Sequence, residues 1–287
     1  MDIGGTKVLV GCLDSGSFQE IGTIPTPTGT PPGKLVERVS NLILAKDSSP
    51  RGVGVGIAGL VDRAEGMLIS SPNMPDWHDC PVGELFFEAL SSPVTVDNDA
   101  NAFAFGAVDS GEIPPKGTWL LITLGTGIGG AVVMDGVIRY GTGFAGEFGH
   151  MTVKVDGPRC ACGSTGCWEI FASRRSVVEY YAEGTGEEPD PREIALRAEN
   201  GDLRAVEAFL RFGEWLGIGM ANLGCCLSPH GFLLAGGLAG AYRLFSPSLK
   251  RVFDQRCHLP LRIRTLAETR ESGAFGAACM ARSAFSR

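Results

Sequence analysis

The sequence carries little charge, no run of basic residues and no long hydrophobic run. Charged residues make up 20% of the 287 residues, and the net charge is −7. Proteins that bind nucleic acid over a broad surface need Lys and Arg to replace the counterions of the phosphates. The acidic balance therefore argues against a nucleic-acid partner.

Membrane-spanning segments and a secretory signal are also missing. Residues 117–134 are uncharged but rich in Gly and Thr, and the uncharged stretch 215–242 is interrupted at residues 228–230. Neither offers the ~20 apolar residues that a spanning helix needs. The first residues, MDIGGTK, lack the charged and then apolar start of a signal peptide. We therefore expect a cytoplasmic protein without a membrane partner.

The nine cysteines, an odd number, and the missing secretory signal argue against a pure disulfide scaffold. Cys160, Cys162 and Cys167 lie close together in the sequence and indicate a metal site. The other six cysteines are scattered among apolar residues, where free cysteine usually serves as a small core residue.

Glycine is what the chain has in excess: 41 of 287 residues, about twice the usual ~7%. The glycines show no strict period, which excludes collagen, and their clusters indicate turns that approach a ligand closely. Apolar residues make up 44%, enough for a sizeable core. The length predicts two domains or lobes.

Strand and helix patterns alternate along the chain, which predicts an α/β class. We expect strands at 8–13, 18–25, 52–61, 94–96, 119–124, 130–134, 232–234 and 261–266. We expect helices at 35–45, 82–90, 100–108, 168–183, 191–199, 202–227, 242–256 and 273–285. Residues 110–116 (SGEIPPK) are the best linker candidate.

The two halves of the chain share a strand–glycine turn–strand unit. Asp14 and Asp135 each end such a unit and lie 121 residues apart. With this offset, Gly4 aligns with Gly125. The match predicts a duplicated core with one glycine turn from each half.

Glycine turns of this kind can hold phosphate groups, because only glycine lets the backbone N–H groups come so close. The candidate phosphate-binding residues are Gly4, Gly5, Thr6, Lys7, Gly125, Thr126, Gly127, Gly129, Gly236 and Gly237. Neither of the first two turns matches the Walker pattern. Either of them alone is better explained as a tight hairpin, but the three Gly-Gly or Gly-Thr-Gly turns together favour nucleotide binding. Asp2 could hold Mg²⁺ through water, or it could simply cap the turn.

The most specific pattern is His150-x9-Cys160-x-Cys162-x4-Cys167. Four nitrogen and sulfur ligands this close together fit a closed tetrahedral zinc site, with no position left for a reactive water. The predicted zinc is therefore structural and would hold the loop in its folded form. A reduced cysteine cluster, or one disulfide with a spare thiol, is the alternative.

Two carboxylates flank this pattern. Glu147 precedes His150 by three residues, and Glu169 follows Cys167 by two. A carboxylate accepts hydrogen bonds from neighbouring hydroxyls, and His150 could bind zinc with one ring nitrogen and a hydroxyl with the other. The group suits a polyhydroxylated ligand, unless the two glutamates are ordinary surface charges.

Acidic and amide residues crowd the junction Asp97-Asn98-Asp99-Ala100-Asn101. An N-cap accounts for one of the acids, and Asp97 is predicted to be that structural residue. Asp99 at a helix N-terminus should stay ionised. Such a weak base suits phosphoryl transfer, which depends mainly on positioning.

The motifs DIGGTK, SPNMPDW, VDNDAN, LGTGIGG, GEFGH and CxCGxxGCxE resemble the ROK family of sugar kinases and repressors along nearly the whole chain. GEFGHMTV and SPNMPDW are most similar to its ATP-dependent glucokinases. The resemblance implies an actin-like/hexokinase-like ATPase fold of two α/β lobes with a zinc-stapled loop. The small lobe would comprise 1–109 and about 273–287, and the large lobe 110–272, with the zinc loop at 157–169.

The resemblance also implies the roles of individual residues in an ATP:hexose 6-phosphotransferase of glycolysis. Asp99 would be the general base that takes the proton of the 6-hydroxyl. ATP, with Mg²⁺, would lie between the first two glycine turns, with adenosine near Gly236 and Gly237. The sugar would lie near Asn73, Asn98, Asp99, Glu147, His150 and Glu169.

Two departures from the family pattern are visible. Family members carry several apolar residues before DIGGTK, so the first strand is expected to be short here. Ala235 replaces the first glycine of the usual triple-glycine adenosine turn.

The function has alternatives within and outside catalysis. Fructose, mannose, N-acetylglucosamine and N-acetylmannosamine remain open as substrates besides glucose. A sugar-sensing repressor would carry a helix-turn-helix before Asp2, where none is expected. A non-catalytic sugar-binding module would not need Asp99 and both glycine turns. We expect a homo-oligomer, either a dimer or a tetramer.

Overall fold

The computed structural model describes residues 1–26, 29–71, 73–266 and 272–285. The chain forms two compact units. The first contains Met1–Pro115, the short segment Tyr140–Phe144 and the C-terminal helix α9 (Ser272–Phe285). The second contains Lys116–Arg139 and the chain from Ala145 onward to the segment before α9.

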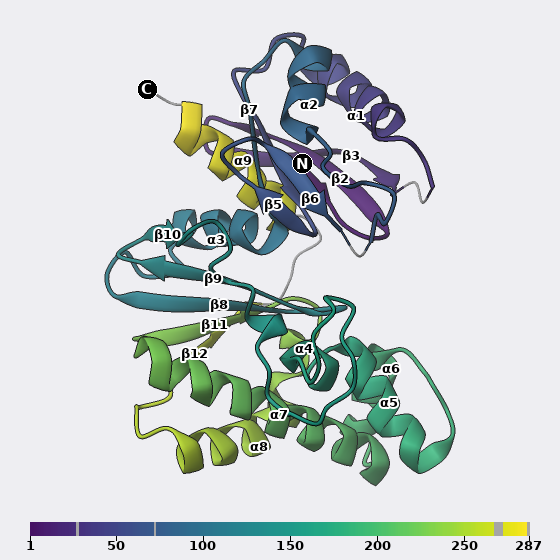
Figure 1. Cartoon of the computed structure of the whole chain (residues 1–287), viewed down its shortest axis with the longest axis vertical. Helices are drawn as coiled ribbons and strands as arrows, with labels where there is room; N and C mark the ends of the chain where they lie inside the picture. The colour runs from purple at the N-terminus through teal and green to yellow at the C-terminus, as the bar shows by residue number, and fades with distance from the viewer. Residues whose placement is uncertain (27–28, 72, 267–271, 286–287) are drawn as a thin grey trace. The chain divides into compact units, whose positions relative to one another are not determined.

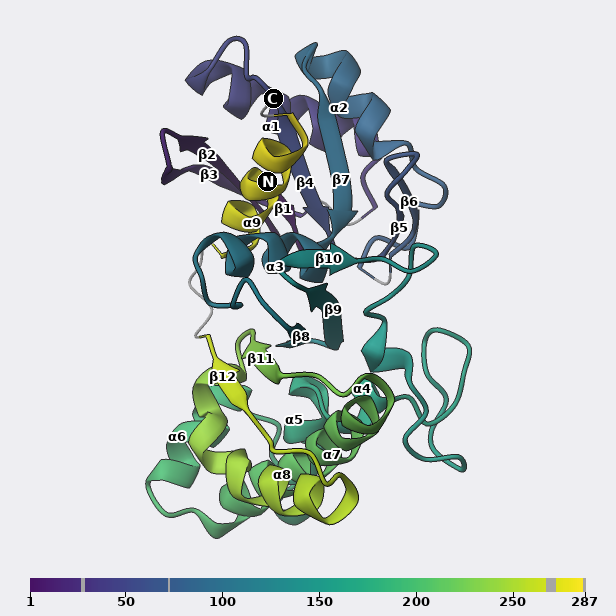
Figure 2. The same ribbon diagram turned by 90° about the vertical axis from the view of Figure 1, so that its left-hand side faces the viewer.

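The first unit is built on a five-stranded sheet with the order β3-β2-β1-β4-β7. Its strands are β1 (Asp2–Ile3), β2 (Lys7–Asp14), β3 (Ser17–Pro25), β4 (Val53–Ile57) and β7 (Val94–Asn98). Figure 2 shows β1, β4 and β7 side by side. Helices α1 (Pro32–Lys46) and α2 (Val82–Leu90) lie on the opposite side of this sheet from α9 (Figure 1). Helix α3 (Asp99–Asp109) packs against α9, and a two-stranded hairpin is formed by β5 (Leu60–Asp62) and β6 (Met67–Ser70).

The second unit repeats this sheet, with the order β10-β9-β8-β11-β12. Its strands are β8 (Thr118–Leu124), β9 (Ile128–Met134), β10 (Val137–Arg139), β11 (Gly231–Ala235) and β12 (Ile263–Thr265). Its helices are α4 (Trp168–Phe171), α5 (Arg174–Thr185), α6 (Pro191–Glu199), α7 (Leu203–Leu227) and α8 (Tyr242–Arg256), with 3₁₀ turns η1 (Phe148–His150) and η2 (Ala239–Ala241).

The pairing pattern of the two sheets is the same, strand for strand. In the first, β1 runs antiparallel to β2 and parallel to β4. In the second, β8 runs antiparallel to β9 and parallel to β11. The predicted α/β class and duplicated core are therefore confirmed.

The offset between the halves changes at the glycine turns. Ile3 pairs with Val8 across the first turn, whereas Leu124 pairs with Ile128 across the second. The first turn is thus one residue longer, and the offset falls from 121 before the turns to 120 after them. The predicted equivalence of Asp14 and Asp135 is wrong for this reason.

Two predicted elements are divided in the structure. The expected strand 52–61 ends at Ile57, because Gly59 takes a φ of 144° and turns the chain into β5. The expected helix 168–183 is interrupted between α4 and α5. Ser173 has an extended backbone there and forms a capping box with Ser176 that begins a new helix.

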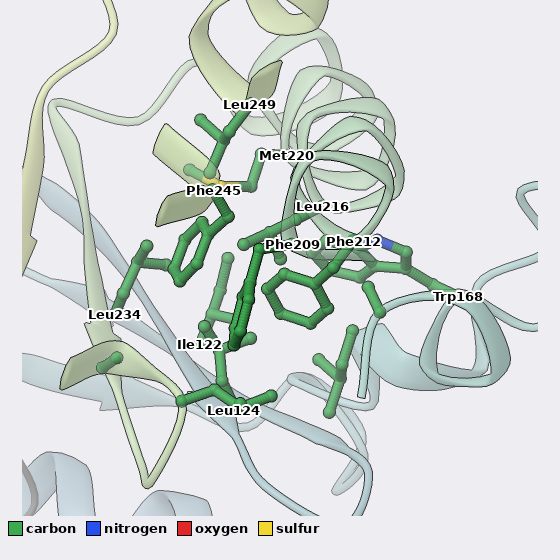
Figure 3. Close-up of a cluster of buried hydrophobic side chains, with 14 of the residues drawn as sticks. Ile122, Leu124, Trp168, Phe209, Phe212, Leu216, Met220, Leu234, Phe245 and Leu249 are labelled. Atoms are coloured by element: carbon green, nitrogen blue, oxygen red, sulfur yellow. The ribbon is translucent and has the colours of Figure 1, made fainter. Parts of the chain in front are cut away.

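The core of the second unit forms between its sheet and α7. Phe212 of α7 meets Phe245 of α8 edge to face, with ring centroids 5.1 Å apart. Figure 3 shows a cluster of buried apolar side chains from β8, β11, α4, α7 and α8. The labelled ones are Ile122, Leu124, Trp168, Phe209, Phe212, Leu216, Met220, Leu234, Phe245 and Leu249. Among the residues that the structure describes, no helix is long and apolar enough to cross a membrane.

Candidate active site and metal centre

The four predicted zinc ligands come together in the second unit. The Nδ1 or Nε2 of His150 and the Sγ atoms of Cys160, Cys162 and Cys167 all lie within 4.8 Å of one another. Sγ of Cys160 is 3.8 Å from Nδ1 of His150, and the Sγ atoms of Cys162 and Cys167 are 3.6 Å apart. The predicted clustering of these side chains is confirmed.

These separations fit a tetrahedral zinc ion. Zn–S bonds of about 2.3 Å and Zn–N bonds of about 2.0–2.1 Å place the ligand atoms roughly 3.5–3.8 Å apart at tetrahedral angles. The 3.6 Å between Cys162 and Cys167 is too long for a disulfide, whose sulfurs lie about 2.05 Å apart. The donor set and its spacing therefore suit a closed structural zinc site.

The loop that carries the cysteines folds back on itself through short backbone bridges. Arg159 pairs with Thr165, and Thr152 pairs with Cys167. Gly166 has a φ of 66°, and a Cβ atom there would overlap the carbonyl oxygen of Lys154. Only glycine allows this crossing, which brings Cys167 back toward His150.

Burial shapes the chemistry of the thiols. It raises the pKa of Cys160 to about 12, and it also raises the pKa of Cys167. These thiols therefore keep their protons at neutral pH unless a cation replaces them. A metal that binds here must release protons, as is usual for cysteine ligands.

His150 joins the cysteine cluster to the two carboxylates. Its Nδ1 faces Cys160 and lies 3.6 Å from Oε1 of Glu169, while its Nε2 lies 3.8 Å from Oε2 of Glu147. Nδ1 is thus the nitrogen that would bind zinc. These side chains are partly exposed, with 39% of His150 and 37% of Glu147 accessible to solvent.

Glu169 is held in place by its neighbour. Trp168 is fully buried, and its Nε1–H donates to the backbone oxygen of Trp215 at 2.8 Å. Cys167, a predicted zinc ligand, is the N-cap of α4. The buried Trp168 and the carboxylate of Glu169 follow it directly in the sequence. The arrangement fixes the backbone of Glu169 close to the zinc ligands.

Two of the predicted phosphate-binding turns lie beside this carboxylate cluster. The N–H of Gly125 donates to the oxygen of Gly127 at 3.0 Å, and a Cβ atom at Gly127 would overlap Oε2 of Glu169. A Cβ atom at Gly236 would lie 2.6 Å from the oxygen of Leu124, directly before the same turn. Glycine turns and carboxylates therefore form one contiguous surface in the second unit.

The remaining glycine-turn residues of this unit are open to solvent or paired in the sheet. Thr126 and Gly237 are exposed. Gly129 pairs with Thr123 in the β8–β9 ladder.

The turn of the first unit is fixed by a residue that sequence reasoning missed. The N–H of Gly4 donates to the oxygen of Lys7 at 3.1 Å. The hydroxyl of Thr26 donates to the backbone oxygen of Gly4 at 2.6 Å. The N–H of Thr26 donates to the backbone oxygen of Thr6 at 3.1 Å. Nothing in the sequence around Thr26 indicates this role.

Two further candidates lie close to glycine backbone in the first unit. A Cβ atom at Gly5 would lie 2.7 Å from Cγ of Asn73. The side chain of Asn73, a residue predicted to bind the sugar, therefore lies against the turn that is predicted to bind phosphate. Asp2 lies in β1 with its carboxylate against Gly273 at the start of α9.

Asp99 is the first residue of α3, as expected, but Asp97 is not the N-cap. The cap is Asn98, whose Oδ1 accepts from the N–H of Ala100 at 2.8 Å and whose Nδ2 donates to Gly59 at 3.0 Å. Asn98 was predicted to bind sugar, and its amide is already engaged. Asp97 is instead buried behind the junction.

The predicted site residues thus fall on both units. Asp2, Gly4–Lys7, Asn73, Asn98 and Asp99 lie on the first; the cysteines, His150, Glu147, Glu169 and the later glycine turns lie on the second. Within each unit the structure brings the candidates near one another.

Comparison with known proteins identifies the family. The sequence model of the ROK family matches residues 1–284. The chain belongs to the ROK family. A glucokinase of Streptomyces coelicolor is 34% identical over 260 residues, covering 83% of this chain and 81% of that protein. An N-acetyl-D-glucosamine kinase of Aliivibrio salmonicida is 32% identical over 266 residues, 88% of this chain and 87% of that protein.

A solved structure is similar over the whole length of this ROK protein. It is a ROK family glucokinase from Streptomyces griseus in complex with glucose and AMPPNP. The TM-score is 0.82 at 32% identity, with 98% of each chain covered. The two-lobed ROK fold expected from the motifs is therefore confirmed.

Proposed function

We propose that this chain transfers the terminal phosphoryl group of ATP to the 6-hydroxyl of glucose. The observation that carries the proposal is the contact of Gly127 with Glu169, which joins a phosphate-type turn to a carboxylate–imidazole cluster. A site that brings a nucleotide and a polyhydroxylated ligand together needs this adjacency. The glucokinase relatives, and the neighbour that binds glucose and AMPPNP, support the same reading.

The sugar would be held by acceptors at its 1- and 2-hydroxyls. Glu147 and Glu169 offer these acceptors side by side, and with Nδ1 of His150 on zinc its Nε2–H would donate to a hydroxyl oxygen. Carboxylates accept hydrogen bonds from free hydroxyls, and such charge-assisted bonds are about twice as strong as neutral ones. Asn73 would also contact the sugar, as would the second N–H of Asn98, whose first N–H donates to Gly59.

Asp99 would act as general base. It takes the proton of the 6-hydroxyl as that oxygen forms a bond to the γ-phosphorus. The bond from the γ-phosphorus to its bridging oxygen breaks, and ADP and glucose 6-phosphate result. Asp99 is the first residue of α3, where the helix dipole favours a negatively charged side chain.

The glycine turns would hold the phosphates. Backbone N–H groups of Gly4–Lys7 and of residues 125–129 can donate to the phosphate oxygens, and Gly236 and Gly237 would lie near adenosine. Magnesium neutralises phosphate charge when it is bound, and the carboxylate of Asp2 would hold it through water.

The zinc would act through the loop rather than on the substrate. Its four ligands leave no open position, so it would fix Nδ1 of His150 and the start of α4. Glu147 and Glu169, the acids proposed to bind the sugar, flank these ligands in the sequence. The zinc loop would hold the two carboxylates at a fixed position relative to each other.

We assign the two lobes of the enzyme to 1–109 with about 273–287, and to 110–272. The first boundary between the two compact units, at Pro115 and Lys116, lies close to residue 110, but the short segment Tyr140–Phe144 inside 110–272 belongs to the first unit.

An acetamido-hexose kinase is the second candidate, since a relative of that name matches at 32% identity. A 2-acetamido group keeps only an N–H donor and adds bulk, so a carboxylate beside it loses a partner. A carboxylate that gives up a water and gains no hydroxyl loses a charge-assisted hydrogen bond, so glucose should bind better than an acetamido sugar.

A coupled ADP-release assay over a panel of sugars tests the proposal. The panel contains glucose, mannose, fructose, N-acetylglucosamine and N-acetylmannosamine, each with ATP and Mg²⁺. We expect the highest kcat/KM for glucose. A tenfold preference for another sugar would correct the substrate, and sugar binding without ADP release would indicate a sensor instead of an enzyme.

A further inference from the structure

The junction of β7 and α3 contains a buried carboxylate that the proposed reaction does not use. Asp97 is only 2% exposed. Its Oδ2 accepts from the hydroxyl of Tyr140 at 2.8 Å and lies 3.2 Å from Nε of Arg63. Its Oδ1 accepts from the N–H of Asn98 at 2.8 Å and from Nδ2 of Asn101 at 2.9 Å. Four separate groups therefore converge on one side chain.

Stability alone is a weak reason for this arrangement. Burying charged groups costs several kcal/mol, and a well-packed apolar set is often as stable as a buried ion pair. Burial raises the pKa of Asp97, which reflects this cost. Oδ1 of Asn101 is also buried and has no hydrogen-bond partner among the described residues. The network therefore costs folding free energy, and because it lies beside Asp99 we look for its role at that residue.

The network holds the chain on both sides of Asp99. Asp97 binds the backbone of the preceding residue, Asn98, and the side chain of Asn101, which follows within the first turn of α3. Asn98 in turn is tied to Gly59 and caps the helix. The backbone at Asp99 is thereby fixed relative to β7 and to the turn before β5.

Tyr140 comes from a distant part of the sequence. It begins the segment Tyr140–Phe144, which belongs to the first unit although Arg139 and Ala145 belong to the second. Its ring also lies under the guanidinium of Arg63, 4.9 Å from the ring centroid. The hydroxyl that reaches Asp97 is thus oriented by a second contact.

We propose that Asp97 and Tyr140 are positioning residues that hold Asp99 where its carboxylate meets the 6-hydroxyl of the sugar. The inference rests on the proposed function. Neither residue touches the substrate; both act through the backbone of the β7–α3 junction. A displacement of about 1 Å at a reacting group can cost 10²-fold in rate, so small changes in this network should be measurable.

Two variants separate positioning from mere support of the fold. Tyr140→Phe removes one hydroxyl and keeps the ring against Arg63. Asp97→Asn keeps the shape and removes the charge. Tyr181→Phe is a matched control, because its hydroxyl donates to Asp202 at 2.9 Å and Arg197 lies over its ring, in a region of α5–α7 apart from the proposed site.

The readouts are kcat, KM for glucose and ATP, the affinity for glucose by calorimetry, and Tm. We expect Tyr140→Phe and Asp97→Asn to lower kcat by about 10- to 100-fold with unchanged glucose affinity. Tyr181→Phe should lower Tm as Tyr140→Phe does and leave kcat unchanged.

A Tyr140→Phe enzyme with wild-type kcat would overturn the positioning role, as would a kcat that falls only with the folded fraction. This conclusion needs no folded Asp97→Asn protein. A wild-type chain that phosphorylates no sugar would remove the proposed function and the positioning role together. A wild-type enzyme that is active, together with Tyr140→Phe and Asp97→Asn variants of unchanged kcat, would remove only the positioning role.

Discussion

Gly127 and Glu169 lie in direct contact: the backbone of the β8–β9 turn occupies the space next to the carboxylate, and any side chain at position 127 would enter it. The atom in the way, Oε2 of Glu169, is the far end of a flexible side chain. A small side chain could therefore be accommodated by moving Glu169, without disturbing the backbone.

Gly127→Ala should accordingly weaken glucose binding while leaving the fold intact. A displaced charge-assisted hydrogen bond is worth about 1.5–3 kcal/mol, or roughly 10- to 100-fold in affinity. Calorimetric titration with glucose and thermal unfolding measure the two effects. Gly33→Ala is the control, since a Cβ atom in α1 at that position meets nothing within 4 Å. Unchanged glucose affinity in Gly127→Ala would show that Glu169 does not bind the sugar.

Asp99→Asn should abolish turnover and keep sugar binding, because asparagine retains the shape but cannot take a proton. Loss of a general base typically costs about 10²–10⁴-fold in rate. The measurement is kcat with glucose and ATP, beside the glucose affinity. Asp47→Asn, an exposed acid after α1, serves as the control. A rate within a few-fold of wild type would exclude Asp99 as the base.

Metal analysis of purified protein should find one zinc per chain. Cys162→Ser should lose the metal and weaken glucose binding, because His150 and Glu169 lose their common anchor. Cys226→Ser, at an exposed cysteine of α7, should keep both. Zinc-free wild-type protein with full glucose affinity would contradict the prediction.

Stability should depend on pH through Asp97. Burial raises the pKa of this carboxyl in the folded protein, so the folded state holds the proton more tightly than the unfolded state. Ionisation therefore costs stability at neutral pH, and this cost disappears as the pH falls through the raised pKa. Asp97→Asn cannot ionise. The free energy of unfolding of wild type relative to this variant, from urea titrations, should increase from pH 7 toward pH 4; a constant or falling difference would be evidence against a raised pKa.

Local patterns in the sequence were enough to predict much of this molecule. The spacing of His150 and three cysteines predicted a cluster that the fold closes, because every ligand lies within one loop. The alternation of strands and helices predicted the α/β class, and the two glycine turns predicted the duplication. These features depend on residues near one another in the chain.

Features that depend on distant residues were not predictable in this way. Tyr140 and Arg63 reach Asp97 only through the fold, and no pattern near residue 140 indicates a buried partner 43 residues away. Asn98 rather than Asp97 is the N-cap because it directly precedes the first residue of α3, whereas Asp97 is a buried residue of β7. Similarly, the break before α5 came from Ser173 and Ser176, whose capping box competes with a continuous helix.

The extra residue in the first glycine turn limits which parts of the two halves could be exchanged. Successive side chains of a strand point to opposite faces, so one inserted residue within β2 or β9 would turn every later side chain from core to solvent. Placed in the turn, the same insertion leaves both faces of both hairpins unchanged. A chimaera that grafts the Gly125–Gly127 turn between Ile3 and Val8 would therefore keep the sheet in register, whereas a graft whose junction falls inside the strand would not.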